Sequence, residues 1–118
     1  MTINIPGIDA QKGLDLYDGD TEIYFTVLHS WVNNTPAALN RLRNVSAATL
    51  SDYAITVHGV KGTSTTIGAE EIRKTAMKLE SLANAGDLSG VLAQNEAFIK
   101  STEDLVNIVQ NWLNEQGV

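Results

Sequence analysis

The C-terminal third of this 118-residue chain carries an apolar stripe that repeats at alternating steps of three and four residues. That spacing keeps one line of side chains on a single face of an α-helix. Asn95 and Thr102 interrupt the stripe without shifting its register. We therefore predict a long helix over residues 88–115, with an inward face formed by Leu88, Val91, Leu92, Asn95, Phe98, Ile99, Thr102, Leu105, Val106, Val109, Trp112 and Leu113.

The same alternation recurs upstream and predicts further helices over residues 21–44 and 69–85. A short leading helix is expected over residues 9–17. Pro36 lies inside the first of the long helices, and we expect it to kink or interrupt that helix because proline lacks a backbone N–H. Capping aspartates and chain-breaking glycines stand at the expected helix ends, at Asp20, Gly68, Gly86 and Asp87.

The middle segment has two possible readings. Residues 54–60 are rich in β-branched side chains, which favours a strand. The apolar spacing instead favours a helix, with a seam at Leu50, Tyr53, Val57, Val60, Ser64 and Ile67. We predict a helix over residues 49–66, because the neighbouring helices need a fourth apolar face to close a bundle. The expected fold is all-α: one domain over residues 1–118, an antiparallel up-down four-helix bundle with a short N-terminal helix.

Composition excludes several classes of protein. The chain has no cysteine, which removes disulfides, thiolate metal sites and thiol nucleophiles. Its net charge of −6 disfavours generalised nucleic-acid binding. No apolar run approaches the ~20 residues that span a bilayer, and the N-terminus lacks the features of a signal peptide. We expect a cytoplasmic, monomeric domain without membrane insertion.

His58 is the residue on which chemistry is most expected. On a helical wheel it lies roughly 130° from the centre of the apolar seam, so it points to solvent from the middle of a helix. Lys61 and Thr65 follow one and two turns later, close to the same face. An imidazole nitrogen is a nucleophile near neutral pH, and a lysine one turn away offsets the charge of a phosphoryl group on that nitrogen.

Two glycines flank this histidine in the helix interior, at Gly59 and Gly62. Each costs about 1 kcal/mol of helix stability relative to alanine. We interpret them as clearance that allows another macromolecule to approach the imidazole closely. Ile55 shares the exposed face and gives it an apolar element for anchoring a partner.

The alternative is that His58 is chemically silent and the domain is a helical adaptor that docks a partner through Ile55, Gly59 and Gly62. A histidine on a helix surface usually has no chemical role. His29 has no matching lysine or glycine and is interpreted as incidental. The two histidines form no pair with metal-ligand spacing, so no metal site is expected. No constellation for an enzyme with its own active site is present.

The run from His58 to Ala69, HGVKGTSTTIGA, followed by Leu79-Glu80, resembles the signature of histidine-containing phosphotransfer (HPt) domains. Upstream, Pro6-Gly7-Ile8-Asp9, Gly13-Leu14, Gly19-Asp20 and Tyr24 resemble the lead-in of HPt modules in hybrid sensor kinases. The departures are mild: Val60 replaces the usual leucine, Thr63 replaces a serine, and Gly59 stands where a small polar residue is commoner.

The resemblance implies a phosphocarrier that has no ATP site of its own. His58 would accept a phosphoryl group from an aspartyl phosphate on a response-regulator receiver domain and pass it to another receiver. Lys61 would be the charge partner and Gly62 the residue that clears the approach. From their place on the same exposed face, we expect Ile55, Gly59 and Thr65 to contact the partner. A sensor (hybrid) histidine kinase is the further implied partner. No cofactor is expected, and Mg²⁺ would be held only by the receiver.

Charge is distributed unevenly along the chain. Between His58 and Lys78 there are four basic residues and two acidic ones, whereas from Glu80 onward six acidic residues face only Lys100. The segment that bears His58 is therefore locally positive. We expect this asymmetry to favour docking to the acidic pocket of a receiver domain.

Overall fold

Helices make up all the regular secondary structure of the computed structural model, which describes residues 2–118. No strand occurs within that range, so the all-α prediction is confirmed and the strand propensity of residues 54–60 does not prevail. The elements in chain order are α1 (Ala10–Asp15), α2 (Thr21–Leu42), the 3₁₀ helix η1 (Ala47–Thr49), α3 (Leu50–Ile67), α4 (Glu70–Asn84) and α5 (Leu88–Gln116). The α-helix ends differ from the expected ones by no more than two residues.

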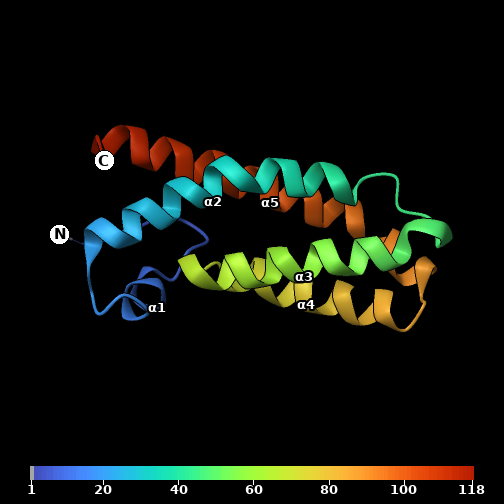
Figure 1. The fold of residues 1–118 in the computed structure, drawn as a ribbon. Coiled ribbons are helices and arrows are strands. Elements are labelled where there is room, and N and C mark those ends of the chain that lie inside the picture. The colour runs from blue at the N-terminus through green and yellow to red at the C-terminus, as the bar shows by residue number, and fades with distance from the viewer. Residues whose placement is uncertain (1) are drawn as a thin grey trace.

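Four long helices lie side by side in an up-down arrangement, with α1 at one end (Figure 1). Short turns join α3 to α4 and α4 to α5, so these helices run antiparallel to their neighbours. α3 packs against both α2 and α4, which leaves only its outer face free. This topology places the middle of α3, where His58 lies, away from both ends of the bundle.

Local capping explains most of the helix ends. The side chain of Asp20 accepts a hydrogen bond from the Ile23 N–H at 3.2 Å, and that of Asp87 accepts one from the Gly90 N–H at 2.9 Å. Gly68 ends α3 with a φ of 81°, a left-handed conformation that favours glycine. A Cβ at this position would also overlap the carbonyl group of Asp9.

Pro36 does not interrupt α2, which is continuous from Thr21 to Leu42. The expectation of an interruption is therefore wrong. Pro36 is exposed, whereas Thr35 and Leu39 beside it are buried against the bundle. The packing of this inner face holds the helix together across the one missing N–H.

A buried polar network explains why Asn95 interrupts the apolar stripe. The Tyr53 hydroxyl donates to Asn95 Oδ1 at 2.8 Å, and Asn95 Nδ2 donates to the Leu42 carbonyl at 2.9 Å. The network joins α3 and α5 to the C-terminal end of α2, where helix carbonyls lack partners of their own. Burial raises the pKa of Tyr53 to about 12, so its hydroxyl remains a neutral donor. Thr102 is satisfied within α5, since its hydroxyl donates to the Phe98 carbonyl at 2.8 Å.

The segment before α2 and the first turn of α2 are tied to the end of α3. The Asp9 N–H donates to the Gly68 carbonyl at 2.8 Å. The hydroxyls of Tyr17 and Tyr24 donate to the carbonyls of Thr66 and Ile67 at 2.9 and 2.8 Å. The last turn of α3 therefore has its carbonyls satisfied by side chains from other elements.

The core follows the predicted seams, with exceptions at the edges. Leu92 was expected inside, but 54% of it is exposed, because it lies at the rim of α5 beside the open loop that follows α2. Trp112 is only half-buried and packs against Phe25, with ring centroids 5.8 Å apart. None of the helices formed by residues 2–118 combines the length and apolar character needed to cross a bilayer.

Candidate functional site

His58 lies in the middle of α3 on the outer face of the bundle. Its side chain is 64% exposed, whereas the adjacent Val57 is fully buried. The same periodicity that directs Val57 and Val60 into the core directs His58 to solvent, as the helical wheel predicted. One edge of the imidazole is held by the protein and the rest is open.

Glu80 of α4 holds this edge and also holds Lys61. Its Oε2 atom lies 2.6 Å from His58 Nδ1, and its Oε1 atom lies 2.7 Å from Lys61 Nζ. The Glu80 side chain is only 17% exposed, so it reaches α3 from the cleft between the two helices. The three side chains form one connected group, which the hairpin of α3 and α4 brings together across 22 residues of sequence.

The hydrogen bond from Lys61 is the largest influence on the pKa of Glu80, and it lowers that pKa below the usual range. The bond to His58 acts in the same direction, while partial burial opposes both. Glu80 is therefore ionised at neutral pH, and a carboxylate only accepts hydrogen bonds. It follows that Nδ1 of His58 carries the hydrogen, so the lone pair of the neutral imidazole is on Nε2.

The two flanking glycines are not required by the packing of this chain. A Cβ atom added at Gly59 or at Gly62 would meet no other heavy atom within 4 Å. At Gly13, by contrast, the added atom would overlap the Tyr24 ring. Space around Gly59 and Gly62 is therefore open on the protein's outer surface, next to the imidazole.

The other residues expected at the partner interface are distributed around His58. Ile55 lies one turn before it and is 72% exposed. Thr65 is exposed, but its hydroxyl donates to the Lys61 carbonyl at 3.0 Å and so is used within α3. Lys61, which was expected to offset a phosphoryl group, is paired with Glu80 in this state.

Glu80 belongs to the Leu79-Glu80 pair of the resemblance, but no role was expected for its side chain. The apolar spacing does contain a signal for Glu80. Leu79 and Ala83 lie on the buried face of this helix, and position 80 lies at the edge of that face. Which helix this rim meets is decided by the fold. Spacing along the chain gives no indication of it.

The remaining polar candidates lie elsewhere. His29 Nε2 is 2.8 Å from the Val118 carbonyl, on α2 beside the end of the chain. Ser64 is fully buried on the seam of α3, with no partner for its hydroxyl among residues 2–118. In the same range, no three acidic or histidine side chains come together in a way that would hold a metal ion.

Comparison with known proteins gives one result that bears on these residues. The family model described as Hpt domain matches residues 26–115, which include α3, α4, Lys61, Glu80 and His58. No curated protein and no solved structure matches the chain. Because the matched region covers most of its length, the chain belongs to the Hpt domain family, whose members serve histidine phosphotransfer in two-component phosphorelays.

Proposed function

We propose that this domain is a phosphocarrier in which Nε2 of His58 accepts a phosphoryl group from the aspartyl phosphate of a receiver domain and passes it to another receiver. The observation that carries the proposal is the contact between His58 Nδ1 and the Glu80 carboxylate at 2.6 Å. This contact leaves the nucleophilic nitrogen on the exposed side of the ring. Family membership supports the same chemistry, because Hpt domains act as phosphocarriers.

Phosphoryl transfer to His58 needs no reactant other than the phosphorylated receiver. The Nε2 lone pair attacks the phosphorus, the acyl phosphate P–O bond breaks, and the aspartate carboxylate leaves with the electron pair. The hydrogen on Nδ1 remains in place, so the phosphorylated ring carries a positive charge. The Glu80 carboxylate lies where it would compensate that charge.

Lys61 is proposed as the charge partner of the phosphoryl group. Its Nζ atom is held one turn from His58 by Glu80, and its side chain is 28% exposed. An ammonium in this place offsets the negative charge that arrives with the phosphoryl oxygens. Gly62, with open space around its Cα, is proposed to let the receiver surface come within reach of Nε2.

The proposed partners are receiver domains of response regulators and a sensor histidine kinase, classes with which Hpt domains interact. The proposal assigns no cofactor to this chain and places any Mg²⁺ in the receiver. It also takes the domain to act as a cytoplasmic monomer that draws on the receiver for phosphotransfer chemistry and does not use ATP itself.

The test is transfer of labelled phosphoryl from a phosphorylated receiver domain. We expect acid-labile, alkali-stable label on the wild-type protein and on the control His29→Gln. His58→Gln should take up none. Label on His58→Gln would assign the acceptor to another residue, and binding of the receiver without any label on the wild-type protein would favour the adaptor.

A further inference from the structure

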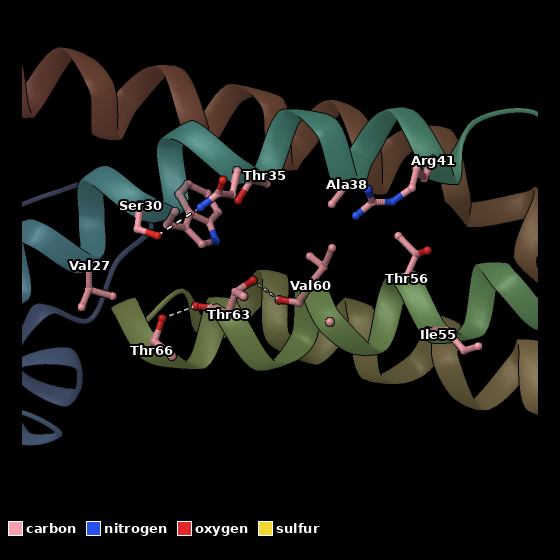
Figure 2. A pocket seen from close by; sticks show the side chains of 13 residues that line it. Val27, Ser30, Thr35, Ala38, Arg41, Ile55, Thr56, Val60, Thr63 and Thr66 are labelled. Carbon is pink, nitrogen blue, oxygen red and sulfur yellow. Dashed lines mark hydrogen bonds between the residues drawn. The ribbon is translucent and has the colours of Figure 1, made fainter.

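A groove of about 480 Å³ runs between α2 and α3 (Figure 2). It shares lining residues with the face of α3 that carries His58. Ile55 and Gly59 belong to both surfaces, because they line the groove and flank the histidine along α3. An occupant of the groove would therefore be in reach of the imidazole. The groove walls include Val27, Trp31, Ala38 and Arg41 from α2, and Val60 and Thr63 from α3.

Among residues 2–118, Arg41 is the only charged residue that lines this groove. Figure 2 shows its side chain on α2, at the end of the groove where Ile55 and Thr56 of α3 lie. Within residues 2–118, six of the eight basic residues make ion pairs with carboxylates, and Arg41 and Lys78 make none. The groove thus presents an unpaired guanidinium and no acidic residue.

Trp31 forms a buried part of the groove wall. Its side chain is only 3% exposed, it lines the groove wall, and its indole Nε1 has no acceptor among the residues that the structure describes. A buried N–H without an acceptor is costly. Because Nε1 itself has no exposed surface, a partner in the groove does not reach this N–H, and the wall at Trp31 offers apolar contact.

We propose that the α2–α3 groove selects the receiver partner of this domain and that Arg41 is a specificity-determining residue that pairs with a carboxylate on that partner. The inference rests on the proposed function, since the partner is the receiver that exchanges phosphoryl with His58. The lining residues of α2 extend from Val27 to Arg41, which is about 21 Å of helix. A contact of this length fixes the orientation of a partner as well as its distance from Nε2.

Recognition of the receiver then does not depend only on the positively charged segment that follows His58. Lys61, Arg73 and Lys74 in that segment are already paired with Glu80, Glu70 and Glu71. Paired cations contribute less to recognition than a free guanidinium, which binds a carboxylate through two parallel hydrogen bonds. Arg41 is the residue whose charge the fold leaves for a partner on this face.

The test compares Arg41→Glu with Lys78→Glu, using a phosphorylated receiver that transfers to the wild-type protein. Both variants change the net charge equally, and both replace an unpaired, exposed cation, but Lys78 lies on α4 and does not line the groove. We expect Arg41→Glu to raise KM for the phosphorylated receiver about tenfold with kcat nearly unchanged. Lys78→Glu should change KM less than about twofold. Arg41→Gln should fall between Arg41→Glu and the wild type, and it serves if the charge reversal disturbs folding.

A charge exchange identifies the partner's side of the contact. Carboxylates on the receiver are replaced by lysine one at a time, and one of these variants should restore a low KM with Arg41→Glu. Equal effects of Arg41→Glu and Lys78→Glu, or no rescue by any receiver variant, would overturn the role of Arg41 while leaving phosphorylation of His58 intact. Failure of every tested receiver to phosphorylate the wild-type protein would instead overturn the proposed function, and this inference with it.

Discussion

Glu80 makes the two nitrogens of the His58 imidazole chemically different, because it contacts only Nδ1. Through its two oxygens it accepts from His58 Nδ1 and from Lys61 Nζ at once. One acidic residue therefore sets the tautomer of the nucleophile and the position of the nearest cation. Neither effect requires Glu80 to touch the phosphoryl group.

Replacement of Glu80 should show this positioning role. We expect Glu80→Ala to slow phosphorylation of His58 about tenfold, because the hydrogen is then no longer held on Nδ1. Glu80→Gln should retain more of the rate, since the amide oxygen still accepts from Nδ1. The matched control is Glu71→Gln on the same helix, whose carboxylate is 85% exposed and does not contact His58. Rates are compared by following transfer from a phosphorylated receiver, and equal rates for Glu80→Ala and Glu71→Gln would contradict the role.

Gly62 should separate stability from activity. No atom of the protein lies near its added Cβ, so Gly62→Ala should raise the free energy of unfolding by up to about 1 kcal/mol. The bulkier Gly62→Gln should leave the fold intact but slow transfer, because its side chain occupies the approach to the imidazole. Urea unfolding and transfer rates measure the two effects. A Gly62→Gln variant that transfers as fast as the wild type would show that Gly62 does not clear the approach to the imidazole.

Gly13→Ala is the contrasting variant. The added methyl overlaps the Tyr24 ring and comes within 3.0 Å of the Ile67 carbonyl oxygen, so we expect lower stability with little effect on the intrinsic chemistry of His58.

Individual helices are held in register by polar groups that interrupt their apolar faces. Asn95 is the clearest example, because its side chain joins three helices through Tyr53 and the Leu42 carbonyl. Thr102 interrupts the same face of α5 but bonds only within its own helix. Two interruptions that are alike in the sequence therefore have different consequences for packing.

Substitution should distinguish them. Asn95→Leu leaves the Tyr53 hydroxyl and the Leu42 carbonyl buried without partners, and we expect it to lower the free energy of unfolding by about 2–3 kcal/mol. Thr102→Val removes a bond to a carbonyl that is already inside α5 and should cost no more than about 1.5 kcal/mol, the net contribution of one neutral hydrogen bond. Urea unfolding of both variants measures the difference. Equal losses would show that the Asn95 network does not carry this stability.

Most of the helical scaffold was predictable from the sequence, because the spacing of apolar residues alone indicates the buried face of each helix. Asp20, Gly68 and Asp87 marked ends for local reasons, and His58 was placed outside by the same periodicity as the core. The pairing of Glu80 with His58 was not predictable, because it depends on which faces of α3 and α4 meet. The continuity of α2 through Pro36 likewise comes from tertiary packing, which overrides a local rule.

For the molecule as a whole, the ion pairs at the site also contribute to the free energy of unfolding, and this contribution depends on pH. A hydrogen bond from Lys61 lowers the pKa of Glu80, and one from Arg73 lowers the pKa of Glu70, below the ordinary carboxyl value of 4.5, and the charges of these cations act in the same direction. A carboxyl with a depressed pKa in the folded state stabilises that state above its unfolded pKa, and the contribution is lost as the pH falls through the folded pKa.

We therefore expect the free energy of unfolding to decline as the pH falls below about 4.5, and to decline less steeply in Glu80→Gln. Urea unfolding over a series of pH values measures both slopes. The exposed Glu71→Gln should keep the wild-type profile. A Glu80→Gln variant as acid-sensitive as the wild type would show that the pairing contributes no pH-dependent stability.

In the proposed mechanism, Nε2 of His58 carries the phosphoryl group while Glu80 holds Nδ1. The most direct measurement is NMR of the phosphorylated domain with isotope-labelled histidine, in which phosphorus–nitrogen coupling identifies the bonded nitrogen. Coupling to Nε2 of His58, absent in His58→Gln, is the predicted result. Coupling to Nδ1, or to the ring of His29, would contradict the account.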